Sequence, residues 1–370
     1  MRSNLNIALV HDWLTGMRGG EKVLEVLCEL FPNATLFTLL HNRGSVSPTI
    51  ERHQILTSFV DRLPLKSKRY RNYLPLFPAA IESMDFSGYD LIVSTSHAVA
   101  KGASPAPGAL HICYCHTPMR YVWELYDEYF GPGKAGVLTR ASMSIIAPRL
   151  RTWDVRSSDR VHHFVANSRN VAGRIHQYYR RPAEVIYPPV STDQFTVSEK
   201  DDGYYLVVSA LVPYKRVDLA ILAARALGER LVIVGTGPEA QKLKALAGRE
   251  TEFLGWKSDV ELSRLYAGCR ALIFPGIEDF GIVPLEAMAS GKPVVAFGAG
   301  GALETVVENP EGPTGIFFRE QTVEALREAL RKLSKVQFDP HKIRRHALRF
   351  DRSVFRSNIH KFIEEKSTRL

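Results

Sequence analysis

The sequence has little cysteine and no long apolar run. Its 370 residues include four cysteines, Cys28, Cys113, Cys115 and Cys269, too few and too scattered for a disulfide framework. Cys113 and Cys115 belong to the apolar run ALHICYCH, so we expect buried thiols in a reducing compartment. No stretch reaches the ~20 apolar residues of a membrane-spanning helix, and the N-terminal sequence MRSNLNIALVHDW has no signal-peptide pattern. We therefore expect a protein that is soluble or peripheral to a membrane.

Motifs for metal binding and for nucleoside triphosphate binding are also missing. The Cys-x-Cys-His triplet at 113–116 has no second ligand pair at a matching spacing. No Asp-x-Asp occupies a suitable loop, and Asp201 and Asp202 lack a third ligand, so we expect no required metal. The glycine-rich stretch at 16–20 lacks the Lys-Ser/Thr of a P-loop, and Glu21 follows it directly, which disfavours phosphate binding there.

Short apolar runs alternate with helical patterns along most of the chain. Continuous rather than alternating apolar strands are typical of parallel sheets covered on both faces. The series occurs twice, which predicts an α/β protein of two doubly wound parallel-sheet domains. The predicted strands are 7–10, 91–96, 111–116 and 163–168 in the first half, then 204–210, 230–235, 271–275 and 293–298.

The break between the two series contains Pro188 and Pro189, followed by polar, turn-forming residues. We predict a first domain at 1–187, a linker at 188–202 and a second domain at 203–348. Apolar residues with helical spacing predict helices near 303–308 and 321–334 and a last helix within 349–370 that returns to the first domain.

Basic residues are unevenly distributed. The formal net charge is +9; residues 140–181 hold nine arginines, and residues 62–71 interleave Lys and Arg with Leu and Tyr. Such asymmetry indicates an anionic partner, with ordinary solvated arginines as the alternative. A basic and aromatic mixture also occurs in nucleic-acid-binding proteins, but no nucleic-acid motif is present.

The stretch FPGIEDFGIVPLEAMASGKPVV, residues 274–295, reads as strand, loop, helix and strand. It places Glu278 on the loop and Glu286 near the start of the helix. The backbone N–H groups of Gly281, Ile282 and Val283 form a seat for a diphosphate at the helix N-terminus. Two carboxylates beside such a seat suit the hydroxyl groups of a sugar and a ribose; the alternative is that Glu286 only compensates the helix dipole and Glu278 is solvated.

Two further loops follow predicted strands in the second half. In SALVPYKRVDLAI, Lys215 and Arg216 stand at a helix start, where the dipole disfavours cations unless a bound anion is present; an exposed, solvated pair is the alternative. The stretch VIVGTGPEAQKL gives a Gly-x-Gly turn at Gly235, which alone is weak evidence for a nucleotide. It fits a nicotinamide-binding fingerprint poorly because the last glycine is missing.

The ordered set LVPYKRVD, VGTGPE, FLGWKSDVELSRLYAGCRALIFP and EDFGIVPLEAMASGKPVV resembles the retaining, nucleotide-sugar-dependent glycosyltransferases of family 4, which have the GT-B fold. The resemblance covers nearly the whole chain and implies two Rossmann-like domains facing each other across a cleft. It implies that Lys215 neutralises the donor diphosphate, that Glu286 binds the ribose, and that Glu278 with the backbone after Phe280 holds the donor sugar.

In the first half, the resemblance places His116 near the transferred sugar and lets Gly19 and Gly20 approach the donor as a lid. It implies retention by same-face attack, in which the leaving phosphate takes the acceptor's proton, with no classical base. The family commonly has Arg where this chain has Ala210. Arg216 is a partial substitute, and a nucleotide-sugar-binding protein with little or no transfer activity is the alternative function.

The stretches CHTPMRYVWELYDEY and VSTSHAVAKG resemble the mannosyltransferase branch that builds bacterial O-antigens and exopolysaccharides. The resemblance implies GDP-mannose as the donor, with a UDP-sugar as the alternative, and a lipid-linked or polysaccharide acceptor. We expect a cytoplasmic enzyme that meets the anionic inner face of the plasma membrane through residues 62–71.

Overall fold

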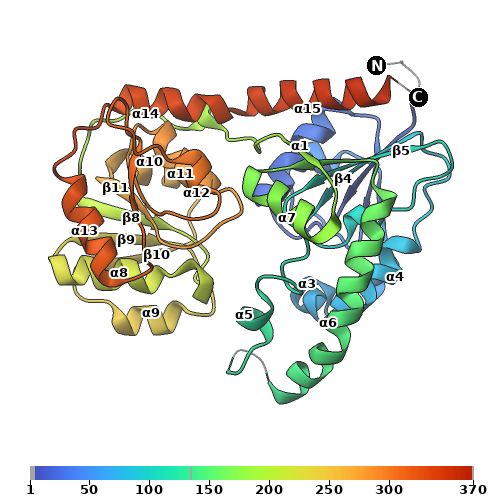
Figure 1. The fold of residues 1–370 in the computed structure, drawn as a ribbon, viewed down its shortest axis with the longest axis horizontal. Helices are drawn as coiled ribbons and strands as arrows, with labels where there is room; N and C mark the ends of the chain where they lie inside the picture. The colour runs from blue at the N-terminus through green and yellow to red at the C-terminus, as the bar shows by residue number, and fades with distance from the viewer. Residues whose placement is uncertain (1–4, 134–135, 369–370) are drawn as a thin grey trace. The chain divides into compact units, whose positions relative to one another are not determined.

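A computed structural model describes residues 5–133 and 136–368. The chain divides into two compact units (Figure 1). Unit 1 comprises Met1–Pro189 and Phe355–Leu370, and unit 2 comprises Val190–Val354. The division differs from the expected domain limits, because most of the segment 188–202 belongs to unit 2. Val190 pairs with Asp351 in an isolated parallel bridge, and Phe195 is buried against Tyr266.

Among the described residues, unit 1 is built on a seven-stranded parallel sheet of order β3-β2-β1-β4-β5-β6-β7. Residue pairs such as Leu9 with Val93 and Val93 with Ile112 fix its central register. Its strands are β1 (Ile7–His11), β2 (Thr35–Thr38), β3 (Ile55–Thr57), β4 (Leu91–Ser96), β5 (Leu110–Cys115), β6 (His163–Ala166) and β7 (Ala183–Val185). The central strands β4 and β5 are buried along their whole length, as their continuous apolar sequences predict.

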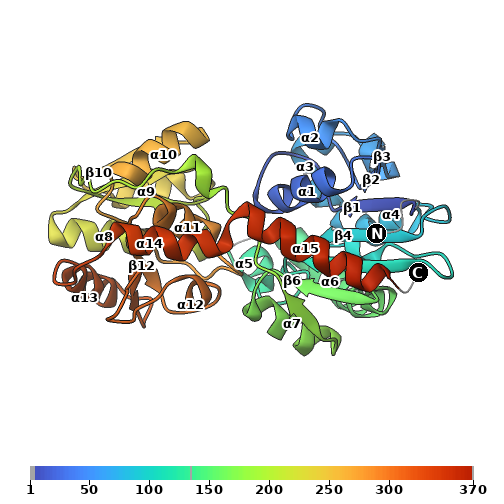
Figure 2. The same cartoon turned by 90° about the horizontal axis from the view of Figure 1, so that it is seen from above.

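Helices cover both faces of this sheet. One face packs against α1 (Gly19–Leu30), α2 (Pro48–Glu51) and part of α15 (Arg352–Ser367); Figure 2 shows α15 beside α1. The apolar side of α15 enters this core through Phe355, Ile359, Phe362 and Ile363. The remaining helical segments of unit 1 are η1 (Phe59–Arg62), α3 (Lys66–Arg69), η2 (Tyr70–Leu76), α4 (Phe77–Glu82), η3 (Ala100–Gly102), α5 (Tyr126–Phe130), α6 (Val137–Ser157), η4 (Ser158–Arg160) and α7 (Arg169–Tyr179).

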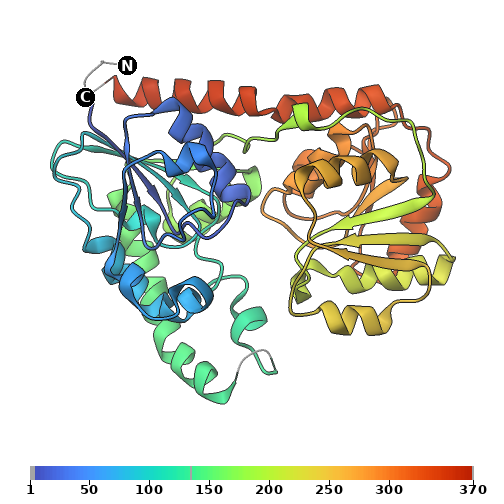
Figure 3. The same cartoon turned by 180° about the vertical axis from the view of Figure 1, so that it is seen from behind.

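In the part of the chain that the structure describes, unit 2 contains a six-stranded parallel sheet of order β10-β9-β8-β11-β12-β13. Figure 3 shows this sheet between its helices. Its strands are β8 (Tyr204–Val208), β9 (Arg230–Val234), β10 (Thr251–Gly255), β11 (Ala271–Phe274), β12 (Val294–Phe297) and β13 (Gly315–Phe318). The helical segments are η5 (Thr192–Gln194), η6 (Pro213–Lys215), α8 (Val217–Leu227), α9 (Ala240–Leu246), α10 (Asp259–Gly268), α11 (Ile282–Ala289), α12 (Ala302–Thr305), α13 (Val323–Leu333), α14 (Pro340–Ala347) and η7 (Leu348–Phe350).

The predicted fold class is confirmed, since both sheets are parallel and doubly wound. Each predicted strand range corresponds to a strand of the structure, and the predicted helices correspond to α12, α13 and α15. The cysteines are free and buried, as expected. No helix within 5–133 or 136–368 combines the length and apolar character needed to cross a bilayer.

Candidate active-site residues in the two units

Both sheets have the strand order in which the winding direction reverses between two neighbouring strands. The reversal lies between β1 and β4 in unit 1, and between β8 and β11 in unit 2. Open parallel sheets bind ligands beyond the carboxyl ends of their strands at this position, because the loops diverge there and leave space. Polar clusters after these four strands are therefore the first place to look for a site.

In unit 2, Lys215 and Glu278 meet at such a position. Lys215 ends η6, which follows β8, and Glu278 lies on the loop after β11. The Lys215 ammonium forms an ion pair with the Glu278 carboxylate, and each side chain is less than one-fifth exposed. The structure thus brings together the two side chains to which the sequence assigns the diphosphate and the sugar. A donor diphosphate would take over part of this pairing.

Arg216 is placed differently from the expectation that it continues the helix beside Lys215. It precedes α8 with a left-handed backbone (φ 50°), a conformation that is uncommon outside glycine. Its guanidinium is paired with Asp218, at 3.2 Å between Nε and Oδ1. Arg216 would therefore have to leave Asp218 to replace the cation that is missing at the exposed Ala210.

Gly235 has a structural explanation. A Cβ atom at this residue would lie 1.8 Å from the carbonyl oxygen of Ser209, so the end of β9 passes too close to the loop after β8 for any other residue. The backbone N–H of Gly235 donates to the carbonyl of Gly255 at 2.8 Å. Since that N–H is occupied, Gly235 shapes the loop rather than offering a donor to a phosphate.

The loop after β11 is held against the loop after β12. A Cβ atom at Gly301 would lie 2.3 Å from the Cα of Phe280, and the N–H of Gly301 donates to the carbonyl of Glu278 at 2.9 Å. Phe280 is buried against Phe350. This packing fixes the backbone between Glu278 and the start of α11.

Helix α11 begins at Ile282, two residues before Pro284, with Gly281 as its N-cap at φ 92°. The first N–H groups of a helix have no partner inside the helix, so those of Ile282 and Val283 are positioned for an anion. Glu286 lies in the second turn and is buried; its Oε2 accepts a hydrogen bond from Tyr266 Oη at 2.9 Å. A carboxylate fixed by a buried tyrosine is more than a compensating charge at a helix start.

In unit 1, Gly19 and Gly20 form the first turn of α1 rather than a loop. A Cβ atom at Gly20 would lie 3.5 Å from the imidazoles of both His11 and His116. The helix start therefore contacts the ends of β1 and β5. Burial, with smaller effects of neighbouring histidines, lowers the pKa of His116 to about 3, so its imidazole is neutral at physiological pH.

The sequence reasoning missed Asp12 and His97. The buried Asp12 carboxylate follows β1 and accepts hydrogen bonds from the backbone N–H groups of residues 97–100 at 2.7–2.9 Å. It also pairs with Nδ1 of His97 at 3.0 Å. Burial alone would raise the pKa of Asp12, but His97 and these hydrogen bonds hold it well below its usual range. His97 directly follows the predicted strand 91–96, and Asp12 lies two residues after the predicted strand 7–10; these positions are the signal that could have found them.

His11 completes this edge of unit 1. Its Nδ1 lies 2.6 Å from Thr95 Oγ1, and its Nε2 lies 3.8 Å from the carboxylate of Glu21. Glu21 is buried and accepts the N–H of Arg18 at 3.0 Å. A histidine thus ends β1, and others follow β4 and β5, yet among the described residues no cluster of three or more His, Cys, Asp or Glu side chains could hold a metal ion.

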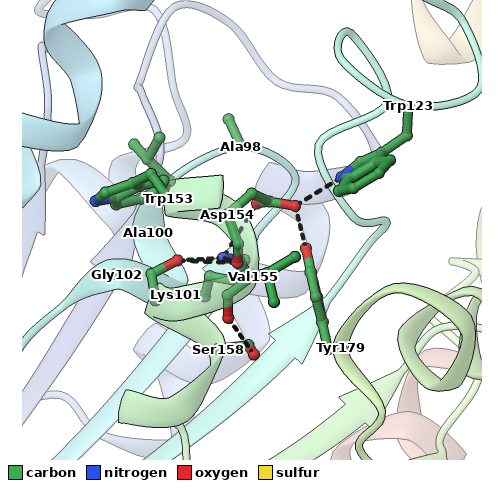
Figure 4. A network of polar contacts seen from close by, with 12 residues as sticks. Ala98, Ala100, Lys101, Gly102, Trp123, Trp153, Asp154, Val155, Ser158 and Tyr179 are labelled. Atoms are coloured by element: carbon green, nitrogen blue, oxygen red, sulfur yellow. Dashed lines mark hydrogen bonds and ion pairs between the residues drawn. The ribbon is translucent and has the colours of Figure 1, made fainter. Parts of the chain in front are cut away.

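A buried ion pair and its hydrogen bonds join four segments of unit 1 (Figure 4). Lys101, in η3 after β4, lies 3.1 Å from the Asp154 carboxylate of α6, and both side chains are at most 1% exposed. Asp154 Oδ2 also accepts hydrogen bonds from Trp123 Nε1 at 2.9 Å and from Tyr179 Oη at 2.8 Å. Trp123 belongs to the loop that follows His116, so this network anchors that loop.

The basic segment 62–71 spans the end of η1, α3 and the start of η2. Its side chains divide into two groups. Arg62, Leu65, Arg69 and Arg71 are exposed, whereas Tyr70 is buried against Trp13. The outward side of the segment is therefore basic with one exposed leucine.

Comparison with known proteins defines the class. The family model described as Glycosyl transferases group 1 matches residues 191–349, and the model described as Glycosyltransferase Family 4 matches residues 17–194. The structure of Anabaena HepE in complex with UDP and glucose superposes with a TM-score of 0.70 at 18% identity, covering 98% of this chain and all of HepE. Two doubly wound units of this kind are the GT-B fold.

The chain belongs to the GT-B glycosyltransferases of family 4. It is 29% identical over 182 residues to an uncharacterized glycosyltransferase of Methanocaldococcus jannaschii, covering 48% of this chain and 50% of that protein. It is 30% identical over 151 residues to the O-antigen chain mannosyltransferase RfbU of Salmonella typhimurium, covering 38% of this chain and 43% of RfbU. The chain thus spans half or less of the length of these two relatives.

Proposed function

We propose that the protein is a retaining glycosyltransferase that moves mannose from GDP-mannose onto a lipid-linked or polysaccharide acceptor in the synthesis of a cell-envelope glycan. The observation that carries the proposal is the meeting of Lys215 and Glu278 at the switch point of unit 2, beside the N-terminus of α11. The mannosyl group is supported by the name of RfbU, whereas the name of the HepE complex supports a UDP-sugar as the alternative donor.

In unit 2, the proposed chemistry concerns the leaving diphosphate. Its negative charge grows as the bond to the anomeric carbon breaks, and fixed positive groups stabilise that charge without reorganising. Lys215 and the N–H groups of Ile282 and Val283 supply them. Glu286 would bind the ribose. Glu278 would bind a sugar hydroxyl once the diphosphate has replaced it beside Lys215. No required metal or cofactor is part of this proposal.

In unit 1, we assign the contact with the donor sugar to Gly19, Gly20 and His116. A neutral His116 suits this position, because a positively charged imidazolium would oppose the positive character that develops on the sugar ring. We propose same-face attack, in which the acceptor oxygen bonds to the anomeric carbon as the bond to the diphosphate breaks, and the hydroxyl proton ends on the diphosphate. Retention by a double displacement would instead need a carboxylate nucleophile close to the anomeric carbon.

For the acceptor side, we propose that the exposed arginines of segment 62–71 and Leu65 contact an anionic membrane from the cytoplasm. Basic side chains near an anionic surface contribute about 1 kcal/mol each. The segment exposes Arg62, Arg69 and Arg71, which gives an attraction that salt would screen.

Donor binding and transfer are tested separately. A ligand that binds only the folded state raises its stability, so GDP-mannose or UDP-glucose should raise the unfolding temperature of the wild type. In Lys215→Gln the binding of the same donor should weaken roughly 10- to 100-fold, as expected for a lost charge-assisted hydrogen bond. Lys242→Gln, which changes an exposed lysine on α9, is the matched control.

Transfer is then measured with the donor that binds, using release of the nucleoside diphosphate and incorporation of radiolabelled sugar into lipid-linked glycans from membranes. Binding without turnover would support the alternative, a nucleotide-sugar-binding protein in which Ala210 replaces a needed cation. Equal donor binding by Lys215→Gln and the wild type would contradict the proposed site.

A further inference from the structure

His97 has a fixed ring orientation that the proposed donor site does not use. Its Nδ1 is paired with Asp12 Oδ2 at 3.0 Å, and the ring planes of His97 and Trp13 are nearly perpendicular, with 4.4 Å between ring centroids. Trp13 is itself buried among Tyr70 and Phe77. Two rigid neighbours therefore set the ring plane.

The environment of Asp12 also sets the position of the ring proton. The carboxylate accepts four backbone N–H groups and is fully buried. The ionised carboxylate requires a donor at Nδ1 of His97, and in the neutral form of the imidazole that donor is the single N–H. The lone pair is then on Nε2, where it can accept a hydrogen bond.

The imidazoles at this edge differ in access. His11 is 1% exposed, and Nε2 of both His11 and His116 is buried. The His97 side chain is 26% exposed, and among the described residues its Nε2 has no hydrogen-bond partner. The ring centroid of His97 lies 6.3 Å from that of His116, so a molecule beside His116 can reach His97.

We propose that Nε2 of His97 accepts a hydrogen bond from the hydroxyl group that attacks the donor sugar, with Asp12 and Trp13 as positioning residues. This role rests on the proposed glycosyltransferase function, in which His116 contacts the donor sugar. Before attack, the hydrogen bond holds the hydroxyl with its lone pairs free. As the oxygen bonds to the anomeric carbon, the hydroxyl proton turns from Nε2 to the leaving diphosphate, so His97 positions the nucleophile and keeps no proton. Since water can replace the acceptor, slow hydrolysis of the donor depends on the same group.

The test replaces His97 by two amide side chains, each of which stands in for one of the two ring nitrogens. His97→Asn keeps an N–H donor near the position of Nδ1, for Asp12, and has no atom at the position of Nε2. His97→Gln offers an amide oxygen near Nε2. His176→Asn, on the exposed face of α7, is the matched control. Release of nucleoside diphosphate from GDP-mannose and UDP-glucose is followed without an acceptor.

We expect His97→Asn to lower kcat roughly 10- to 100-fold, as misplacing an attacking group does, with an unchanged KM for the donor and an unchanged unfolding temperature. His97→Gln should recover part of kcat, and His176→Asn should match the wild type. A kcat of His97→Asn equal to that of the wild type, or an effect confined to the donor KM, would overturn the proposed role of His97. Either result would leave the proposed glycosyltransferase function standing.

Histidine ¹⁵N NMR of the wild type tests the same idea without depending on a variant that must fold. The ring of His97 should carry its proton on Nδ1, and a proton on Nε2 would overturn the proposal. If the wild type turns over neither donor even with the membrane acceptors present, the proposed function fails, and the role of His97 in transfer fails with it.

Discussion

Breaking the buried ion pair of Lys101 and Asp154 should lower the free energy of unfolding strongly, and removing both charges should cost no more than removing one. Removing one partner leaves an uncompensated charge in the core of unit 1, and such changes cost about 3–5 kcal/mol. Lys101→Met leaves the carboxylate with Trp123 and Tyr179 as donors, and Asp154→Asn leaves the ammonium with Ser157 and the Asp154 carbonyl. We expect each single variant to lose about 3 kcal/mol of unfolding free energy.

The double variant Lys101→Met/Asp154→Asn buries no charge. Its loss should therefore be smaller than the sum of the two single losses by about 3 kcal/mol, since neighbouring sites are not additive. Urea unfolding measures these differences. For a unit of this size the slope is about 2–3 kcal/mol per molar urea, so each single variant should shift the midpoint down by about 1 M.

Tryptophan fluorescence suits this assay, because Trp123 and Trp153 both lie at the network. Of the four tryptophans, Trp256 is the one in unit 2. Replacing this exposed residue by Phe leaves a signal that comes from unit 1. Lys361→Met, which breaks an exposed i,i+4 pair on α15, is the control and should cost no more than about 0.5 kcal/mol. Single losses under 1 kcal/mol, or an additive double variant, would refute the reasoning.

Three further results are expected. Acid should destabilise unit 1, because burial lowers the pKa of His111 and His116 to about 3 from 6.5. Between pH 6.5 and 3 the unfolded chain binds these protons and the native state does not, so stability falls by up to ~1.4 kcal/mol per pH unit for each histidine; urea midpoints should show this slope, and His111→Asn should flatten it. Gly20→Ala should retain transfer, since a Cβ atom there only touches two imidazoles, whereas the larger side chain of Gly20→Val should impair transfer without unfolding the protein; undiminished transfer by Gly20→Val would remove this helix start from the site. Neutralising the arginines of segment 62–71 to Gln should weaken salt-dependent binding to phosphatidylglycerol vesicles, and unchanged flotation would exclude this membrane surface.

The sequence predicted the fold class because continuous apolar strands of β4, β5 and β11 leave little ambiguity. It missed five strands: the edge strands β3, β7, β10 and β13, of which β10 (TEFLG) contains a charge, and the four-residue strand β2. The conformation of residues 190–202 depends on contacts such as that between Val190 and Asp351, which no local pattern reveals.

For the candidate site as well, the sequence predicted some of the residues and missed others. Loops that follow a recognisable strand identified Lys215 and Glu278, and the structure brings them together. It reassigns Gly235 to close backbone packing, because a clash with a carbonyl far along the chain cannot be read from a Gly-x-Gly turn. Asp12 and His97 went unnoticed since their pairing joins residues 85 positions apart.

The path of α15 has a consequence for the order of events during synthesis. Phe355 and Ile363 complete the core of unit 1, yet the ribosome makes them only after every residue of unit 2. Unit 2, a continuous segment, can close while the nascent first unit still lacks one of its covering helices. A chain released after residue 354 would expose an apolar sheet face in unit 1 and become a target for chaperones or proteases, even with unit 2 fully folded.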